Sequence, residues 1–377
     1  PFFQRLSRIK QLGLTYLVYP GAHHTRFHHA IGATYLMKQA ISTIKEMGIS
    51  ITEEEEYGVL MAILLHDIGH GPYSHALEHS FLHEIDHETV SEIFMHKLNA
   101  HFNGALDVAI QIFKDEYSKG FLHQLVSSQL DMDRLDYLKR DSFFTGVSEG
   151  VVSNQRIIKM FDIDNDEILI KEKGIYSIEK FIVARRLMYW QVYLHKTVLS
   201  AEFLLAKIID RAREIILSGE KLFTTPHILL FLKNKISVNE LKNDDCLTAF
   251  SSLDDNDIMT CVKVWSSSDD EVLKKLSTML VNRKLLKVKI SDAPFSDKEI
   301  SALKEKHQKA LKIDSHEVNY FVFQEYMINN AYDPRKDTIK VKFKDGTIRD
   351  ITEASDNLNI SALAKPVTKY YLFAPYF

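Results

Sequence analysis

The feature that most constrains this chain is an apolar run that ends in ionisable residues. Residues 59–65 read Val-Leu-Met-Ala-Ile-Leu-Leu, and His66 and Asp67 follow at once. Seven apolar residues with helix-favouring Leu, Met and Ala predict a buried helix, so the two polar side chains at its end must be satisfied inside the protein. A bound metal ion would satisfy both. An isolated His-Asp pair is more often a hydrogen-bonded pair in a core.

Two more histidines follow within ten residues of that pair. Glycines and a proline over residues 69–72 predict that the helix stops, so His70 and His75 lie on the turn after it. Three histidines and an aspartate this close to a helix end favour a metal site over a core pair. The histidine distribution agrees, since 12 of the 17 fall between His23 and His101.

The pattern of apolar residues divides the chain into two units. With 377 residues, of which 45% are hydrophobic and 26% charged, it can bury one large core and a second, smaller one. Helical periodicity dominates residues 1–215, whereas residues 216–377 mix helical and alternating runs. We therefore expect a mainly α protein, in which a helical core is followed by a smaller C-terminal α+β lobe.

Charge and cysteine content exclude several classes of protein. The net charge of −4 and the pI near 6.5 give no basic field for nucleic-acid phosphates, so a nucleic-acid partner is not expected. No apolar run reaches the roughly 18 residues of a membrane span, so a membrane partner is not expected either. With only Cys246 and Cys261 present, we expect reduced thiols and a cytoplasmic location.

Two helices are predicted beside the His-Asp pair. The first covers residues 25–47 and carries Arg26 and His29 on one face. The second ends in the pair and begins at Thr52, because Thr52 and Glu55 have the spacing of a capping box. The glutamates of its first turn are therefore interpreted as helix-terminal charges and not as metal ligands.

A second informative stretch covers residues 129–141. As a helix, it aligns Asp133, Tyr137 and Asp141 in one row, with Arg134 beside the row. This arrangement is typical of the wall of a polar site. An exposed helix with salt bridges is the alternative interpretation.

A third row of residues has the same four-residue spacing. It consists of Arg185, Tyr189 and Tyr193. Taken alone, the row is interpreted as aromatic core with an arginine whose charged end reaches solvent.

The smaller lobe is predicted to alternate helices with strands. Helices are expected near residues 225–234, 255–265, 270–282 and 297–311, and strands near 286–290, 318–326, 339–343 and 370–373. The sequence Lys344-Asp345-Gly346 between two alternating runs predicts a hairpin.

The ligand types indicate a class of reaction. Two histidines and two aspartates can form a mixed nitrogen and oxygen site: His29, His66, Asp67 and Asp133. Such a set suits one divalent Mn, Fe, Zn, Ni or Mg ion and does not identify the metal. The ion would activate water and neutralise a phosphate oxygen, while nearby histidines move protons and arginines bind phosphates. Hydrolysis of a phosphoester is the reaction that these residues fit.

Three segments resemble the HD-domain phosphohydrolases, a family named for its paired His-Asp ligands. They are residues 26–29 (Arg-Phe-His-His), 65–75 and 131–137, and residues 4–6 and 9–13 also match. The resemblance extends over about residues 1–200 and is to the branch that hydrolyses deoxynucleoside triphosphates (dNTPs), which includes the dGTPases. It implies an all-helical HD domain in the first unit, and hydrolysis of dGTP or of a broader set of dNTPs to deoxynucleoside and inorganic triphosphate.

The resemblance also implies roles for individual residues. It assigns the metal to the four ligands named above. It adds four catalytic or phosphate-contacting residues: His70, His75, Glu78 and His87. For the triphosphate it suggests Arg26, Arg134 and Arg185, and for the sugar and base it suggests Gln11, Tyr137, Asp141, Tyr189 and Tyr193. An aromatic ring under the sugar 2′ carbon would exclude a ribose hydroxyl, which would favour deoxynucleotides.

Partners and rival functions follow from the same resemblance. It implies a homo-dimer or homo-tetramer, and a possible nucleotide activator at an interface site with basic positions, here Arg156, Lys171, Lys173, His195 and Lys196. One rival function is another HD chemistry, such as that of a nucleotidase or a cyclic-nucleotide phosphodiesterase. The other rival is a non-catalytic nucleotide-binding regulator.

Overall fold

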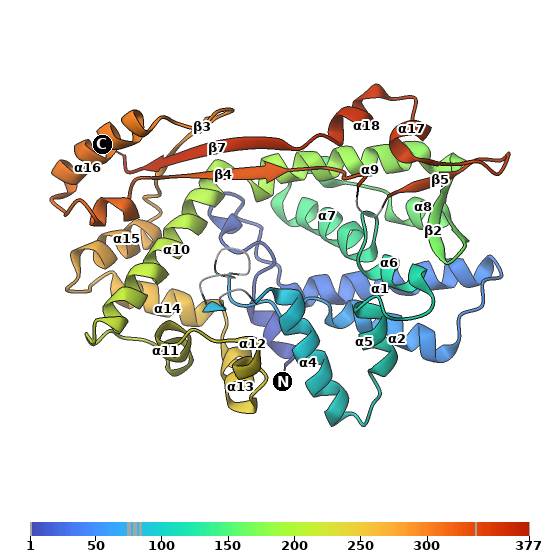
Figure 1. Ribbon diagram of the computed structural model, residues 1–377, viewed down its shortest axis with the longest axis horizontal. Coiled ribbons are helices and arrows are strands. Elements are labelled where there is room, and N and C mark those ends of the chain that lie inside the picture. The colour runs from blue at the N-terminus through green and yellow to red at the C-terminus, as the bar shows by residue number, and fades with distance from the viewer. Residues whose placement is uncertain (1, 74–76, 78–80, 83–84, 336–337, 377) are drawn as a thin grey trace.

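The computed structural model describes residues 2–73, 77, 81–82, 85–335 and 338–376, and Figure 1 shows that most of them are helical. The helices of the first unit are α1 (Arg26–Glu46), α2 (Glu53–Leu65), α4 (His87–His101), α5 (Asp107–Phe113), α6 (Gly120–Val126), α7 (Met132–Thr145), α8 (Asn154–Lys159) and α9 (Ile175–Met188). A π-helix, η6 (Tyr189–Tyr193), then leads into the long helix α10 (Lys196–Leu217). Short 3-10 helices occur at η1 (Gln4–Arg8), η2 (Thr15–Leu17), η4 (Ser148–Gly150) and η5 (Glu172–Gly174).

The remaining residues form shorter helices and most of the strands. The helices are α11 (Pro226–Lys233), α12 (Val238–Leu241), α13 (Asp244–Ser252), α14 (Asp255–Trp265), α15 (Glu271–Val281), α16 (Asp297–Leu311), η7 (Glu317–Tyr320), α17 (Ile351–Ala354) and α18 (Leu358–Leu363). The strands of the whole chain are β1 (Phe161–Asp164), β2 (Glu167–Lys171), β3 (Lys287–Ser291), β4 (Phe323–Asn329), β5 (Lys340–Lys342), β6 (Ile348–Asp350) and β7 (Val367–Ala374). The prediction of a mainly α protein with strands concentrated in a smaller C-terminal region is confirmed.

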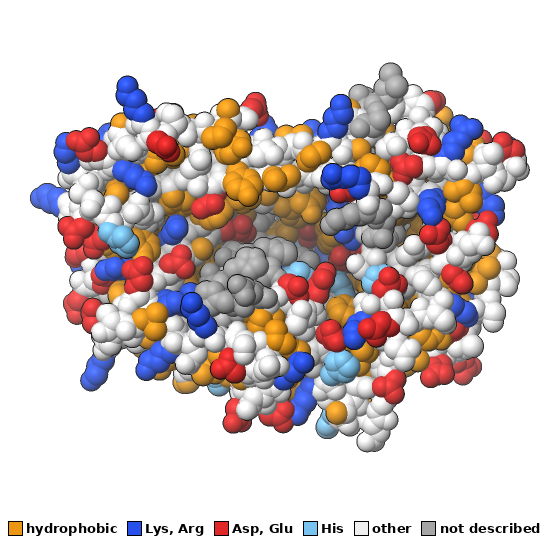
Figure 2. Space-filling view, in the orientation of Figure 1, with side chains coloured by type: hydrophobic (Ala, Val, Ile, Leu, Met, Phe, Trp, Pro, Cys, Tyr) orange, Lys and Arg blue, Asp and Glu red, His pale blue; other side chains and the backbone are white. Residues whose placement is uncertain are grey.

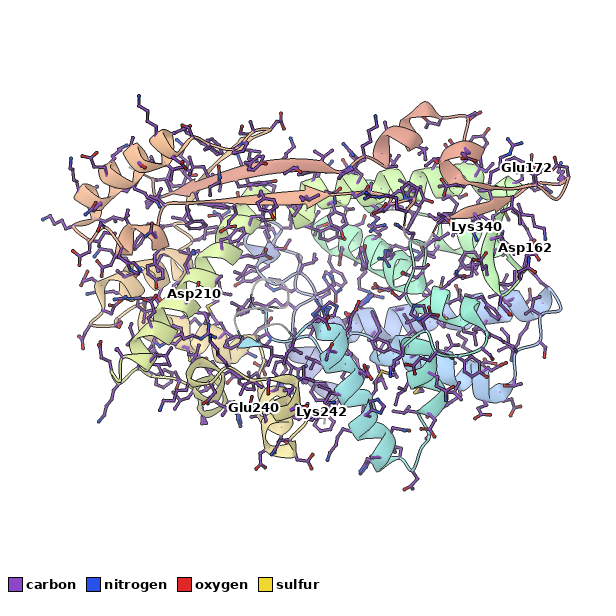
Figure 3. All side chains as sticks on the ribbon, viewed as in Figure 1. Asp162, Glu172, Asp210, Glu240, Lys242 and Lys340 are labelled. Atoms are coloured by element: carbon purple, nitrogen blue, oxygen red, sulfur yellow. The ribbon has the colours of Figure 1, made fainter. Side chains whose placement is uncertain are left out.

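Among the described residues, the strands form two small sheets with the orders β1-β2-β5-β6 and β3-β7-β4. In the first sheet, Asp162, Leu169 and Lys340 form one row across three strands, and Figure 3 places the two labelled members of this row near each other. In the second sheet, β4 and β7 run side by side along one edge of the molecule (Figure 1). Hydrophobic side chains gather along these two strands in Figure 2, and Tyr326 and Ile328 of β4 are exposed.

The division of the chain at residue 215 stays a prediction, because one helix and one sheet extend across it. Helix α10 runs across this position, and β2 of the first unit pairs in parallel with β5 of the second. The hairpin of β1 and β2 lies in a region that was expected to be helical, so the sequence analysis missed it. Its strands are only four and five residues long, and although β1 alternates apolar and polar residues, the run is too short to predict a strand by itself.

Two helices that carry site residues pack closely at a glycine. Helix α1 lies against α7, and a Cβ added to Gly32 of α1 would lie 2.2 Å from Oδ1 of Asp136 and 1.8 Å from Nη2 of Arg140. Glycine in a helix interior is about 1 kcal/mol less favourable than alanine, so its presence here follows from the space that the α7 side chains occupy.

The helix signals in the sequence agree well with the structure. Helix α1 differs from its predicted range by one residue at each end, and the predicted capping box of Thr52 and Glu55 begins α2. Helices α14 and α16 have the predicted bounds, and the hairpin of β5 and β6 encloses the predicted turn. Strand β4 begins later than predicted, because the 3-10 helix η7 occupies residues 317–320. None of the helices in the described ranges has both the length and the apolar composition needed to span a membrane.

Candidate functional site

Three of the predicted metal ligands meet where α1, α2 and α7 come together. His29 is on α1, His66 is the residue that ends α2, and Asp133 is in the first turn of α7. One ligand atom from each lies within 4.8 Å of the others. The Nε2 atoms of His29 and His66 lie 3.0 and 3.5 Å from Oδ1 of Asp133.

The hydrogen bonds of this group leave both Nε2 atoms facing the shared centre. They are buried, and neither has a hydrogen-bond partner among the described residues. Nδ1 of His66 lies 2.6 Å from the carbonyl oxygen of Ile63, and Nδ1 of His29 lies 2.8 Å from Oδ2 of Asp136. A donation from Nδ1 in each ring leaves the Nε2 lone pair free to bind a cation. Two imidazole nitrogens and a carboxylate arranged in this way fit a divalent metal ion.

The electrostatic environment keeps the carboxylate of this group ionised. Burial raises the pKa of Asp133, but the close approach and the charges of His29 and His66 outweigh it, so that the pKa is well below its usual value. Burial lowers the pKa of His29, and the close approach of the Asp133 and Asp136 carboxylates reverses the shift and raises it. The histidines and carboxylates therefore stabilise each other's charged forms. A bound cation would take over the positive charge that the histidines supply here.

The fourth predicted ligand, Asp67, adjoins the group without belonging to it. Its Oδ1 lies 3.4 Å from Nε2 of His66, and its Oδ2 lies 3.9 Å from Nε2 of His29. Oδ2 also accepts a hydrogen bond from Nη1 of Arg26. Burial raises the pKa of Asp67, but Arg26, His66 and His70 more than offset it, so this carboxylate is also ionised. Its role as a ligand stays a prediction.

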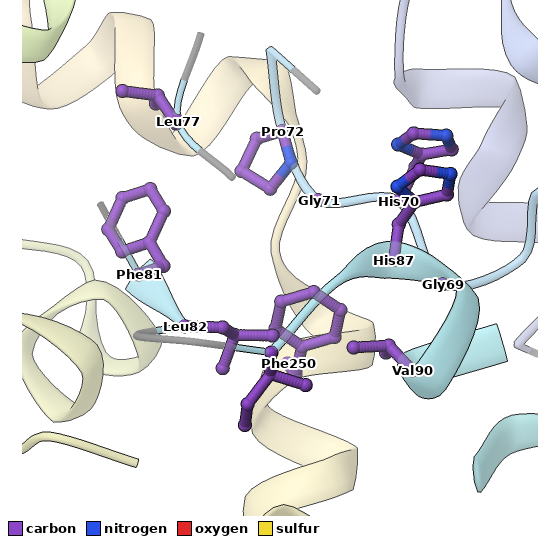
Figure 4. Close-up of a pocket in the computed structure, with 11 residues that line it drawn as sticks. Gly69, His70, Gly71, Pro72, Leu77, Phe81, Leu82, His87, Val90 and Phe250 are labelled. Atoms are coloured by element: carbon purple, nitrogen blue, oxygen red, sulfur yellow. The ribbon is translucent and has the colours of Figure 1, made fainter. Parts of the chain in front are cut away.

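Two further predicted residues, His70 and His87, stack on each other beside the ligand group. The ring centres are 3.9 Å apart, and the angle between the planes is 16°. Figure 4 shows the two rings lying face to face. Burial and the charge of Arg26 lower the pKa of His70 well below its usual value, so its imidazole is neutral. The stack requires a glycine at residue 69, because an added Cβ there would lie 2.2 Å from the carbonyl oxygen of His87.

The turn that carries His70 is held by two buried residues that the sequence analysis did not single out. Arg5 donates from Nη1 to the carbonyl oxygens of Ile68 and His70, at 3.0 and 2.7 Å. Asp255, from α14, accepts a hydrogen bond from the backbone N–H of Tyr73 at 2.9 Å. Tyr73 has a positive φ of 51°, which is unfavourable for a tyrosine, so outside contacts are needed to hold the turn in this shape.

A cavity of about 620 Å³ opens beside the ligand group. Its lining includes six predicted residues near the metal ligands: Arg26, Asp67, His70, His87, Asp133 and Arg134. It also includes all five residues suggested for the sugar and base: Gln11, Tyr137, Asp141, Tyr189 and Tyr193. Segments far apart in the sequence therefore form one wall, as expected for a binding site assembled by the fold.

The three predicted phosphate-binding arginines differ in position. Arg26 and Arg134 line the cavity, and each pairs with a carboxylate, Asp67 and Asp131 respectively. Arg185 is not one of the lining residues, and its guanidinium is 6.0 Å from the centre of the Tyr189 ring. Its Nη1 donates to Oε1 of Gln129 at 3.1 Å.

The aromatic residues of the cavity decide between interpretations that the sequence left open. Tyr193 packs edge-on against Tyr189 at 5.1 Å and against Tyr137 at 6.1 Å. The π-helix over residues 189–193 widens the turn from which two of these rings project, a feature common at functional sites. Tyr189 and Tyr193 therefore line a cavity and are not simply core. Helix α7 is also not an exposed helix, because Leu135, Leu138 and Asp141 are buried.

Other lining residues were missed because they belong to apolar patterns. The lining also includes Leu199, Glu202, Phe203 and Met327, which come from α10 and β4. Glu202 follows the buried residues Val198, Leu199 and Ala201 in sequence, and a carboxylate on the apolar face of a helix is the signal that could have revealed it. Met327 carries no such signal. His75 and Glu78, predicted as catalytic, lie outside the described residues.

Comparisons with known proteins agree with this geometry. The HD domain family matches residues 26–139, which contain the three candidate ligands, and the HD associated region matches residues 152–225. A crystal structure of a phosphohydrolase from Bacteroides thetaiotaomicron VPI-5482 is 52% identical, has a TM-score of 0.95, and is matched over 100% of this chain and 94% of that one. The chain belongs to the HD-domain phosphohydrolases.

Two other relatives show where this HD-domain phosphohydrolase stands within the family. The protein YwfO of Bacillus subtilis (strain 168) is 35% identical over 294 residues, which are 75% of this chain and 65% of that protein. The deoxynucleoside triphosphate triphosphohydrolase SAMHD1 homolog of Dictyostelium discoideum is 31% identical over 240 residues, 58% of this chain and 46% of that protein. The HD-domain phosphohydrolase thus spans about two thirds of the first relative and about half of the second.

Proposed function

We propose that this HD-domain phosphohydrolase hydrolyses dNTPs to deoxynucleoside and inorganic triphosphate with the help of a divalent metal ion. The observation that carries the proposal is the continuity of the cavity, which joins a metal-ligand group with two arginines to a wall of tyrosines and a carboxylate. The triphosphate of a dNTP would fit beside the metal-ligand group and the arginines, and its sugar and base would fit beside the tyrosines. The name of the Dictyostelium relative supports the same substrate class.

The charged end of the cavity is suited to a polyphosphate. Arg26 and Arg134 already pair with carboxylates, so their positions are fixed before a ligand binds, and a guanidinium can bind phosphate oxygens with two N–H groups at once. His70 is neutral and can accept or donate a proton near its stacking partner, His87. Held by His29, His66 and Asp133, a metal ion would supply a Lewis acid and lower the pKa of a bound water molecule.

The opposite end is suited to a deoxynucleoside. The carboxylate of Asp141 and the amide of Gln11 can bind sugar hydroxyl groups, and the tyrosine rings offer flat apolar surface to sugar and base. A ring close to the 2′ carbon would leave no room or partner for a ribose hydroxyl. This arrangement favours dNTPs over ribonucleotides.

The experiment that tests the function is product analysis by phosphorus NMR. The protein loaded with Mn²⁺ or Mg²⁺ is incubated with each dNTP in turn, and an Asp133→Asn variant serves as the control. We expect inorganic triphosphate and deoxynucleoside from the wild type and no product from the variant. Release of orthophosphate or pyrophosphate would instead assign the site to another HD chemistry, and tight nucleotide binding without turnover would indicate a regulator.

Assembly and location belong to the same proposal. We propose a homo-dimer or homo-tetramer in the cytoplasm that takes part in dNTP catabolism, with a nucleotide as possible activator. Sedimentation analysis with and without each nucleotide tests the assembly. If no nucleotide changes the oligomeric state or the rate of hydrolysis, the activator is excluded.

A further inference from the structure

A buried histidine that no role has been given lies directly behind the sugar end of the cavity. Nε2 of His24 is 2.7 Å from Oδ1 of Asp141, and the side chains of the two residues are 0% and 2% exposed. Because a carboxylate can only accept, Nε2 is the donor in this hydrogen bond. The His24 ring also stacks on Phe144, with 4.4 Å between ring centres and 13° between planes, which fixes its orientation.

The second oxygen of the same carboxylate is held from the other side. Tyr193 donates from its hydroxyl group to Oδ2 of Asp141 at 2.8 Å. His24, Asp141 and Tyr193 therefore form a chain of three side chains from three separate segments, and the last two line the cavity. A carboxylate has about four lone-pair sites, so two donors leave Asp141 able to accept another hydrogen bond from a ligand.

We infer that His24 is a positioning residue for substrate selection: it fixes the Asp141 carboxylate so that Asp141 accepts a hydrogen bond from the 3′-hydroxyl group of the deoxyribose. The inference rests on the proposed function, since it assumes that a dNTP places its sugar at Asp141. His24 does not line the cavity and acts only through Asp141.

The physical reason lies in the cost of a misplaced carboxylate. Asp141 is on the last turns of α7, where its own backbone does not fix the side-chain torsions. With His24 in place, both oxygens have donors and one orientation is preferred, so the substrate meets an acceptor that needs no reorganisation. Without His24, the carboxylate turns toward Tyr193 or toward water in the cavity, and a 3′-hydroxyl group gains little from it.

Two variants and one control separate positioning from general stability. His24→Phe removes the donor and keeps a ring that can stack on Phe144. His24→Gln places an amide N–H where Nε2 donates and serves as the conservative rescue. His23→Phe is the matched control, because His23 is the neighbouring histidine, is exposed and stacks on Tyr16 at 5.0 Å instead.

The decisive measurement compares a dNTP with its 2′,3′-dideoxy analogue. We expect the wild type and His23→Phe to lose about 10- to 100-fold in kcat/KM when the 3′-hydroxyl group is absent, as for loss of a hydrogen bond to a charged group. In His24→Phe this ratio falls to less than about threefold, and His24→Gln restores part of it. A general folding defect would lower kcat/KM equally for both substrates and leave their ratio unchanged. An unchanged ratio in His24→Phe would therefore overturn the inference.

Binding measurements keep this test separate from the proposed function. Calorimetry of the same substrate pair, with Ca²⁺ present, reports the 3′-hydroxyl contact without turnover. Suppose that the wild type releases no triphosphate but binds the dNTP more tightly than its analogue, and that His24→Phe removes this difference in affinity. The proposed hydrolysis is then wrong, and the positioning role of His24 stands. If both proteins bind the two ligands equally, the role of His24 is wrong, whatever the activity.

Discussion

Nδ1 of His29 lies 2.8 Å from Oδ2 of Asp136, while Nε2 of the same ring lies 3.0 Å from Oδ1 of Asp133. Both carboxylates belong to the first half of α7, three residues apart. This helix therefore supplies the candidate ligand Asp133 and also Asp136, which orients the candidate ligand His29. Asp136 is itself held by Arg140, which donates to it from Nε at 2.8 Å. The orientation of His29 therefore depends on a residue that does not face the metal group.

Replacing Asp136 with Asn should weaken metal binding without removing a ligand. An amide carries no negative charge and is a weaker acceptor for Nδ1 of His29 than a carboxylate. The imidazole therefore becomes a weaker ligand for the metal. Loss of such an outer partner typically costs about 10- to 100-fold in metal affinity. Titration of the metal-free protein with Mn²⁺, followed by calorimetry, measures the change. Asp164→Asn, at the end of β1, is the control and should bind as the wild type does; an equal affinity in both variants would contradict the prediction.

Replacing His66 with Ala should abolish metal binding and triphosphate release together. The imidazole provides one of the three ligand atoms grouped among the described residues, and its other nitrogen contacts a backbone carbonyl, so we expect the fold to tolerate its loss. Metal content by mass spectrometry and product by phosphorus NMR are the two readouts, with circular dichroism to confirm folding. His96→Ala, an exposed histidine on α4, should change neither quantity. Turnover that persists without bound metal would exclude this ligand set.

The sequence pointed to the three grouped candidate ligands because they lie near helix ends that have their own signals. His66 ends an apolar run, and Asp133 follows the N-cap Asp131 of α7. The residues that orient them were not revealed. Asp136 looks like one of many helix charges, and His24 pairs with Asp141 across 117 positions of sequence, which no local pattern can show. Partnerships of this kind are made by packing and become visible only in the fold.

The same distinction applies to the fold. Helices with caps, such as α2 and α16, were predicted nearly to the residue because hydrogen bonds within a few positions define their ends. The hairpin of β1 and β2 was missed, since its strands are only four and five residues long and are completed by β5 from 171 residues further along. Its structure depends on tertiary pairing and only weakly on local propensity.

Asp255 should be needed to hold the turn that carries His70. Its Oδ1 accepts from the N–H of Tyr73, and its Oδ2 accepts from the N–H of Lys10. In Asp255→Asn, the amide NH₂ would face one of these donors, leaving it buried without an acceptor at a cost of about 1–3 kcal/mol. Urea unfolding should show this loss relative to Asp245→Asn, an exposed control on α13. Identical unfolding midpoints for the two variants would show that the turn is held by other contacts.

Glu202 should make the protein less stable as the pH rises. Glu202 lines the cavity beside apolar residues of α10, and its burial raises its pKa from 4.5 to about 8. Between these two values the folded state keeps a proton that the unfolded state releases, so the free energy of unfolding falls with increasing pH. The effect has an upper limit of about 5 kcal/mol at pH 8, and solvent in the cavity reduces it.

Replacing Glu202 with Gln removes the titrating group while it keeps the size of the side chain. We expect the variant and the wild type to melt at similar temperatures at pH 5, and the variant to melt several degrees higher at pH 8. Glu220→Gln, at an exposed position just after α10, should show no such divergence. Parallel melting curves of Glu202→Gln and the wild type from pH 5 to pH 8 would mean that the carboxylate is already ionised, and that water or a cation in the cavity stabilises its charge.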